Sequence, residues 1–231
     1  MSFIWDGLLQ AITLIISGDS EIFQIAWLSL RVSGLAILIS VVFGVPIGTI
    51  LALSKWRAKK FWLSMVHTGM ALPPVVVGLV ISIMLWRTGP LGILGLMYTP
   101  TAMTMAQFII SAPIVMGLTA SGLQQLDSRL QDQLLGLGAS RRQVIWLLWR
   151  EAKLPIFAGV MVGFGRVIAE VGASMMVGGN LRSSTRVLTT AIVLENSKGN
   201  FALAIALSAI LMTLVFVITL CLTWIQQREL R

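Results

Sequence analysis

Long uncharged runs of apolar residues fill most of the 231-residue chain. No Asp, Glu, Lys or Arg occurs in residues 32–54 or 61–86, and residues 154–179 carry only Arg166 and Glu170. A helix needs about 20 predominantly apolar residues to cross the hydrocarbon core of a bilayer. The pattern therefore predicts a membrane-spanning helix in each of these three regions.

The remaining sequence predicts two more spans and one shorter helix. The uncharged run 88–126 is too long for one span, and Gly-Pro and Thr-Pro breaks near its start leave a helix at about 101–123. A last span is expected at about 201–225. The apolar stretch within residues 1–21 is shorter, so we expect an interfacial segment that lies on the membrane or packs at its edge. The sequence thus predicts an all-α integral membrane protein, a single domain with about five transmembrane helices.

Composition agrees with this class. The chain is 57% hydrophobic and only 11% charged, whereas soluble domains carry about 25% charged residues. The net charge of +8 does not indicate a nucleic-acid partner, because the basic residues lie between the predicted spans. The single cysteine, Cys221, cannot form an intrachain disulfide.

The distribution of Lys and Arg predicts the orientation. Basic residues concentrate in the loops after the first and third predicted spans, at Lys55, Arg57, Lys59, Lys60, Arg129, Arg141, Arg142, Arg150 and Lys153. The first 21 residues hold acidic residues but no basic one. Because basic loops stay in the cytoplasm, we expect the N-terminus outside and the C-terminus in the cytoplasm.

The basic loop at 124–153 has its own helical pattern. Leucines recur at three- and four-residue steps from Leu123 to Leu137, which indicates an amphipathic helix ending at Gly136 or Gly138. Ser140 with Gln143 forms a capping-box pattern that opens a second helix. The resulting tip carries Arg141 and Arg142; it is either a docking site for a partner or a loop that only satisfies the positive-inside rule.

This loop resembles the cytoplasmic signature loop of binding-protein-dependent ABC importer permeases, E-A-A-x-x-x-G followed by I-x-L-P. Asp132 takes the place of the glutamate and Gly138 that of the glycine, while Gln133 and Leu134 replace the alanines. A Leu-Pro pair follows at 154–155, four residues later than the pattern expects.

Four other segments are similar to molybdate-type and especially tungstate-type permeases: residues 71–80, 87–107, 163–180 and 185–201. The resemblance implies a homodimer in the prokaryotic plasma (inner) membrane with a molybdate-type permease fold. It also implies two cytoplasmic ABC ATPase subunits and an extracytoplasmic oxyanion-binding protein. The residues that would couple this chain to the ATPase are Asp132, Gln133, Gly136, Gly138, Ala139, Ser140, Arg141 and Arg142.

The chain lacks the phosphate-binding pattern G-x-x-x-x-G-K-[ST]. We therefore expect a transport subunit that is not an enzyme and binds no cofactor, with ATP and Mg²⁺ held by the partner ATPase. The only histidine, His67, has no second histidine to share a metal, so no metal site is expected.

The fourth span contains charges that a lipid-facing helix would avoid. Small and charged residues share one predicted helix face, opposite a bulky stripe: Gly159, Gly163, Arg166, Glu170 and Ala173 against Phe164, Ile168, Val171 and Met175. Arg166 and Glu170 either form an ion pair that locks the span to a neighbour, or they belong to the translocation path.

Further candidates follow from polar residues and breakers within spans. Ser111, Thr119, Ser174 and Asn180 are predicted to line the path or gate, and Pro73 and Pro74 are either a hinge or a fixed bend. In the fourth loop an apolar patch lies on the outer surface, or else is a packing element: Val187, Leu188, Ala191, Ile192 and Leu194. With Arg182 and Arg186 the surface alternative would contact the binding protein.

The sequence therefore predicts the permease subunit of an ATP-driven tungstate importer. Molybdate or another oxyanion is the nearest alternative cargo. An ATPase-independent secondary transporter or channel would show internal repeats or more spans, and no convincing repeat is present. An intramembrane enzyme lacks a nucleophile–base or metal set.

Overall fold

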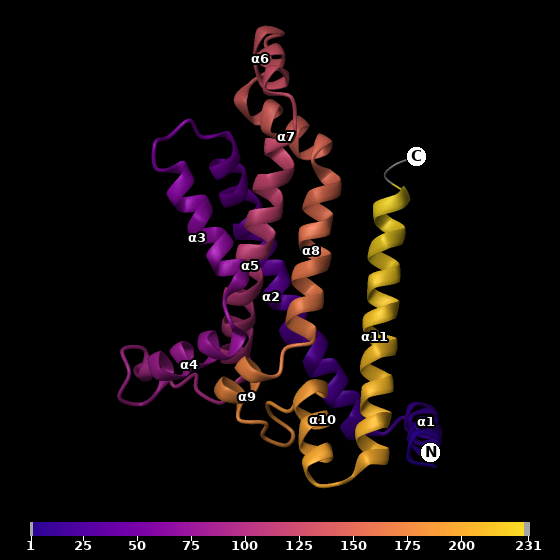
Figure 1. Ribbon diagram of the computed structural model, residues 1–231. Coiled ribbons are helices and arrows are strands. Elements are labelled where there is room, and N and C mark those ends of the chain that lie inside the picture. The colour runs from indigo at the N-terminus through magenta and orange to yellow at the C-terminus, as the bar shows by residue number, and fades with distance from the viewer. Residues whose placement is uncertain (1, 229–231) are drawn as a thin grey trace.

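The computed structural model describes residues 2–228, and the regular elements in this range are all helices, with no strand (Figure 1). The elements in chain order are α1 (Ser2–Ile16), α2 (Ser20–Leu53), α3 (Lys59–Ala71), α4 (Pro74–Leu85), the 3-10 turn η1 (Gly92–Leu94), α5 (Pro100–Gln124), α6 (Ser128–Gly136), α7 (Arg141–Glu151), α8 (Lys153–Ile168), α9 (Gly172–Gly178), α10 (Leu188–Ser197) and α11 (Phe201–Arg228).

Three of the described helices, α2, α5 and α11, are long and apolar enough to cross a membrane. Two bent pairs, α3 with α4 and α8 with α9, raise the number of candidate spans to five. The five predicted regions are thus confirmed as helical, but two of them are broken where the sequence predicted continuous spans.

The break between α3 and α4 lies at the Pro73-Pro74 pair and turns the chain by 98°. Pro73 holds an extended backbone, and Pro74 takes the first position of α4, where its missing N–H costs nothing. The region 61–86 is therefore two helices bent at the proline pair, not one continuous helix, and the two helices together are still a candidate for one span. Pro46 and Pro113 lie inside continuous helices.

The break between α8 and α9 bends the chain by 59°. The Glu170 carboxylate accepts a hydrogen bond from the N–H of Ala173 at 2.9 Å, which satisfies a free amide in the first turn of α9. The Glu170 carbonyl accepts one from the Thr189 hydroxyl at 3.0 Å, a partner outside the helix. The predicted single face running from Gly159 to Ala173 is therefore interrupted after Ile168.

Helix α5 lies in the core, packed between α2 and α8 (Figure 1). Ala106 and Val115 on α5 are completely buried, and the packing with α2 is close at Gly48. A Cβ on Gly48 would lie only 2.6 Å from the carbonyl oxygen of Met116. The absence of a side chain at Gly48 therefore permits the close approach of α2 and α5.

Helix α1 lies beside the lower end of α11 (Figure 1). Gly7 faces Ile205 of α11 so closely that a Cβ would lie 2.6 Å from that side chain, and Ala11 is buried. The short apolar stretch is thus a helix packed against α11, and its position at the membrane interface stays a prediction.

Helix α10 corrects the interpretation of the fourth loop. Leu188 and Ala191 are buried in one cluster with Ile25 of α2 and with Leu207 and Ile210 of α11. The apolar patch therefore does not lie on the outer surface, and the alternative of a packing element is confirmed.

The two ends of the bundle differ in charge. The loop between α2 and α3, the α6–α7 turn and the C-terminal end of α11 lie at the top of Figure 1, whereas α1, α9 and α10 lie towards the bottom. The basic loops thus gather at the top, and by the positive-inside rule this end is cytoplasmic. The bottom is then the outer end.

Candidate functional site

The α6–α7 turn projects beyond the bundle at the cytoplasmic end (Figure 1). The predicted leucine-rich helix is in fact two helices, since α5 ends at Gln124 and Asp127 starts α6 by accepting a hydrogen bond from the N–H of Arg129 at 2.9 Å. The leucine periodicity continues across the junction between α5 and α6 because the leucines on both sides of it contact the same apolar cluster.

The end of α6 and the start of α7 follow the predicted local signals. Gly138 has a φ of +85°, the left-handed conformation that glycine adopts without steric cost. The Ser140 hydroxyl accepts from the N–H of Gln143 at 3.5 Å, and the Gln143 side chain accepts from the N–H of Ser140 at 2.8 Å. The predicted capping box is confirmed and fixes the direction in which α7 leaves the turn.

The turn displays most of the predicted coupling residues to solvent. Ala139 is half-buried, and the exposed members are Asp132, Gln133, Gly136, Gly138, Ser140, Arg141 and Arg142. Leu137 is 85% exposed at the tip, whereas its spacing predicted only that it belongs to a helical stripe. On the inner side Leu130 and Leu134 pack against Leu148, so the exposed tip stands on a packed base.

Three of the predicted path residues are buried within the single chain. The Ser111 hydroxyl is hydrogen-bonded to that of Ser40 on α2 at 2.6 Å, and Ser174 accepts from the Gln107 amide at 3.4 Å. Thr119 is also completely buried. In this conformation these side chains join helices of one chain, and their contact with an anion stays a prediction.

Arg166 and Glu170 do not form an ion pair. Arg166 is exposed on the surface of the single chain and has no hydrogen bond or ion pair to another described residue. Glu170 is only 9% exposed and its carboxylate instead starts α9. The break in the helix separates these two residues, which a continuous helix would have stacked one turn apart.

Asn180 lies just after α9 with a φ of +51°. Its amide donates to the carbonyl of Thr190 at 3.4 Å, while its side-chain oxygen is buried with no hydrogen-bond partner. Asn180 therefore connects the end of α9 to α10.

A cluster of charges at the outer end was not identified from the sequence. Arg182 binds Glu21 through two hydrogen bonds, at 2.9 Å and 2.5 Å, and this contact raises the pKa of the Arg182 guanidinium. Arg186 lies 3.7 Å from the same carboxylate. No local pattern indicates this contact, because 161 positions separate Glu21 from Arg182.

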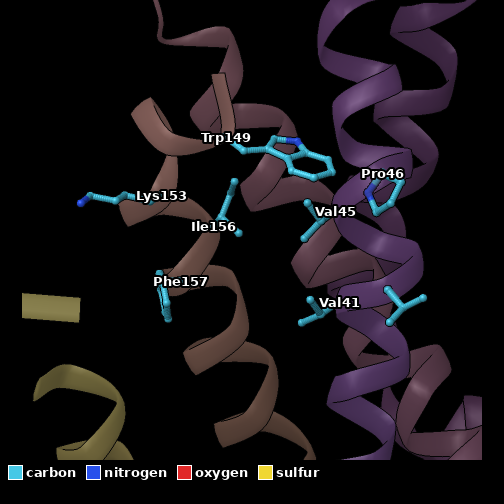
Figure 2. Close-up of a pocket in the computed structure, with 8 residues that line it drawn as sticks. Val41, Val45, Pro46, Trp149, Lys153, Ile156 and Phe157 are labelled. Carbon is cyan, nitrogen blue, oxygen red and sulfur yellow. The ribbon is translucent and has the colours of Figure 1, made fainter. Parts of the chain in front are cut away.

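A groove between α2 and α8 is apolar, in contrast to the charged cluster at the outer end. Figure 2 shows Val41, Val45, Trp149, Ile156 and Phe157 around a cavity of about 460 Å³, with the amino group of Lys153 pointing away from it. Its lining is almost entirely carbon, so the groove offers an oxyanion few hydrogen-bond donors.

The described residues contain no group of three or more His, Cys, Asp or Glu side chains arranged to hold a metal ion.

The described residues thus form a bundle of candidate membrane spans, two of them bent, with an exposed turn at the basic end. The family model described as binding-protein-dependent transport system inner membrane component matches residues 44–231, and the chain belongs to this family of multi-pass membrane proteins.

Individual relatives within this family include permeases for tungstate and for molybdenum. The chain is 39% identical to a tungstate uptake system permease protein of Peptoclostridium acidaminophilum, over 98% of this chain and 100% of the relative. It is 32% identical to a protein of the same description from Campylobacter jejuni, over 99% and 94% of the two chains. Identity to the molybdenum transport system permease protein of Escherichia coli K12 is 28%, over 87% and 92%.

The fold is also found in solved structures. An inward-facing methionine ABC transporter matches with a TM-score of 0.75 over 91% of this chain and 97% of the other. The identity is only 15%, so this match shows the shared fold.

Proposed function

We propose that this chain is the permease subunit of an ATP-driven tungstate importer. It works as a homodimer with two cytoplasmic ATPase subunits, which bind ATP and Mg²⁺, and with an extracytoplasmic tungstate-binding protein. Family membership supports the importer, and the near full-length similarity to two tungstate permeases supports the cargo.

The observation that carries this proposal is the α6–α7 turn. Its exposed tip, with Leu137 and the two arginines at 141–142, offers one apolar and two cationic contacts to a partner. Because α7 packs against the bundle through Val144 and Leu148, a force on the tip is transmitted to the spans. ATP-driven closure of the ATPase pair would in this way change the packing of the permease helices.

The exposed position of Arg166 supports a translocation path for the anion between the two copies of the permease. A charge within a span costs about 2.5–3.5 kcal/mol on insertion scales when it faces lipid. Arg166 is exposed on the single chain, so in the dimer it faces the partner copy or a water-filled path. We propose the path, where its guanidinium would attract a dianion.

The test uses liposomes that contain the permease, its ATPase and its binding protein. ATP hydrolysis is measured against rising tungstate, molybdate and sulfate, and tungstate is expected to stimulate at the lowest concentration. Stimulation by molybdate at a lower concentration than tungstate would support an importer whose cargo is molybdate. Anion movement without the ATPase would contradict the importer.

Gly138→Asp tests the turn in the same assay. A side chain at φ +85° is strained, and the turn should lose its geometry and the tungstate-stimulated hydrolysis. Gly95→Asp is the matched control, since Gly95 is also left-handed at φ +59° with open space around it, but lies in the loop between α4 and α5. Equal loss in both variants would show general misfolding and no specific role for the turn.

A further inference from the structure

A polar cavity of about 280 Å³ lies at the outer end of α2. Glu21 and Arg31 line it from α2, and Ser183, Ser184 and Arg186 line it from the loop that follows α9. The cavity thus combines two guanidinium groups and two hydroxyl groups with a single carboxylate.

The carboxylate is already neutralised from the other side. Both oxygens of Glu21 accept hydrogen bonds from Arg182, at 2.9 Å and 2.5 Å. Arg186 has only the longer contact of 3.7 Å to Glu21, and its Nε is buried without a hydrogen-bond partner. Arg186 therefore retains unused donor capacity next to the cavity.

Arg31 adds a second cation. It is exposed and has no hydrogen bond or ion pair with another described residue. It directly precedes the uncharged stretch 32–54, which ends at the cytoplasmic face, so Arg31 lies at the outer boundary of the hydrocarbon core. With Glu21 paired to Arg182, the cavity carries surplus positive charge close to where an anion must enter.

We propose that this cavity is an outer binding site for a tetrahedral oxyanion. Arg31 and Arg186 bind the anion by charge-assisted hydrogen bonds, and the hydroxyl groups of Ser183 and Ser184 donate to its remaining oxygens. Because the Glu21 carboxylate is paired with Arg182, it opposes anion binding only weakly. This inference rests on the proposed function and extends it with an entry site.

The experiment measures tungstate binding directly. The permease–ATPase complex, without its binding protein, is placed in lipid nanodiscs and equilibrated by dialysis against sodium tungstate, which is quantified by mass spectrometry of the metal. Arg31→Gln and Arg186→Gln are each expected to weaken binding about tenfold or more, since hydrogen bonds to charged groups are the strong ones. Raising the ionic strength should weaken binding to the wild-type complex as well.

Arg31→Gln is the decisive variant, because Arg31 contacts no other described side chain through a polar interaction and its loss leaves the fold intact. Arg87→Gln is the matched control: it removes an exposed arginine from the loop after α4, outside the cavity. Unchanged affinity in Arg31→Gln, or equal weakening in Arg87→Gln, would overturn the site.

A second measurement separates this site from protein docking and from failure of the importer itself. If Arg31→Gln weakens capture of the binding protein but not of tungstate, the arginines serve docking and the anion site is overturned. If the complete wild-type importer shows no tungstate-stimulated ATP hydrolysis, the proposed cargo fails. Stimulation of the wild-type importer, together with unchanged tungstate binding in Arg31→Gln, rejects the site alone.

Discussion

The indole N–H of Trp149 donates a hydrogen bond to the hydroxyl of Thr49 at 2.8 Å, across 100 positions of the chain. Trp149 belongs to α7, which starts at the exposed cytoplasmic turn, and Thr49 belongs to the buried face of α2. The bond therefore connects the element that we propose contacts the ATPase directly to a membrane span. The Thr49 hydroxyl in turn donates to the carbonyl of Val45 at 2.7 Å, which fixes its direction.

Removing this bond should loosen the connection between α7 and α2. Trp149→Phe and Thr49→Val are each expected to lower the free energy of unfolding by about 1 kcal/mol, the net value of a typical hydrogen bond. The double variant should cost less than the sum, because both changes remove the same interaction. Denaturant titration in detergent micelles measures all three. Thr213→Val is the control, since that exposed threonine bonds only the carbonyl of Ala209 in its own helix. Full additivity would show that the two residues are not coupled.

Gly48 sets the distance between α2 and α5. Gly48→Ala would place a methyl group 2.6 Å from the Met116 carbonyl oxygen, so the helices must separate, at a cost of about 1–3 kcal/mol. Gly34→Ala on the same helix has open space around it and should stabilise by about 0.5–1 kcal/mol, because alanine is the better helix former. Thermal unfolding of both variants tests this contrast. A neutral Gly48→Ala would contradict the close packing.

Glu170 is expected to act through the start of α9. Glu170→Ala leaves the Ala173 N–H without its acceptor and should destabilise by about 1 kcal/mol, in the range of lost helix caps. Glu170→Gln keeps a side-chain oxygen that accepts the same bond, so it should preserve stability. Unfolding and transport are measured together. If Glu170→Gln keeps its stability and loses transport, the carboxylate charge matters in the path.

Acid sensitivity should come partly from Glu195. The Asn200 amide, at 2.7 Å, and the Lys198 ammonium, at 2.8 Å, hold the pKa of the Glu195 carboxyl below its usual range. A depressed folded-state pKa contributes stability above the unfolded pKa, about 4.3, and this is lost as pH falls through the folded pKa. Glu195→Gln should therefore flatten the stability profile below about pH 4.5.

Unfolding temperatures across that acid range give the profile. Glu151→Gln removes an exposed carboxylate that has no hydrogen bond or ion pair to the described residues, and it should leave the profile unchanged. Equal flattening in both variants would place the acid sensitivity elsewhere.

Local signals in the sequence predicted the features that depend on neighbouring residues. The helix at 101–123 was predicted to within a residue of α5, because a long uncharged run that follows proline breaks has one favourable place in a bilayer. Gly138 and the Ser140–Gln143 capping box were predicted from their spacing, because the atoms that interact are at most a few residues apart. The break at Pro73-Pro74 follows from the missing N–H of proline.

Tertiary contacts decided the rest. At the break in the fourth span, the carbonyl of Glu170 accepts a hydrogen bond from Thr189, which lies on the far side of a loop. The apolar patch in α10 is buried because Ile25 and Leu207 pack against it. The periodicity of the sequence cannot show whether an apolar face packs against the protein or lies on its surface. Arg186 lies next to Glu21 because the loop after α9 packs against α2. Sequence by itself thus determined which segments enter the membrane and where helices start and stop, since these depend on solvation and local backbone bonding. Which side chains meet across the bundle depended on the packing of distant helices, and only the folded chain shows it.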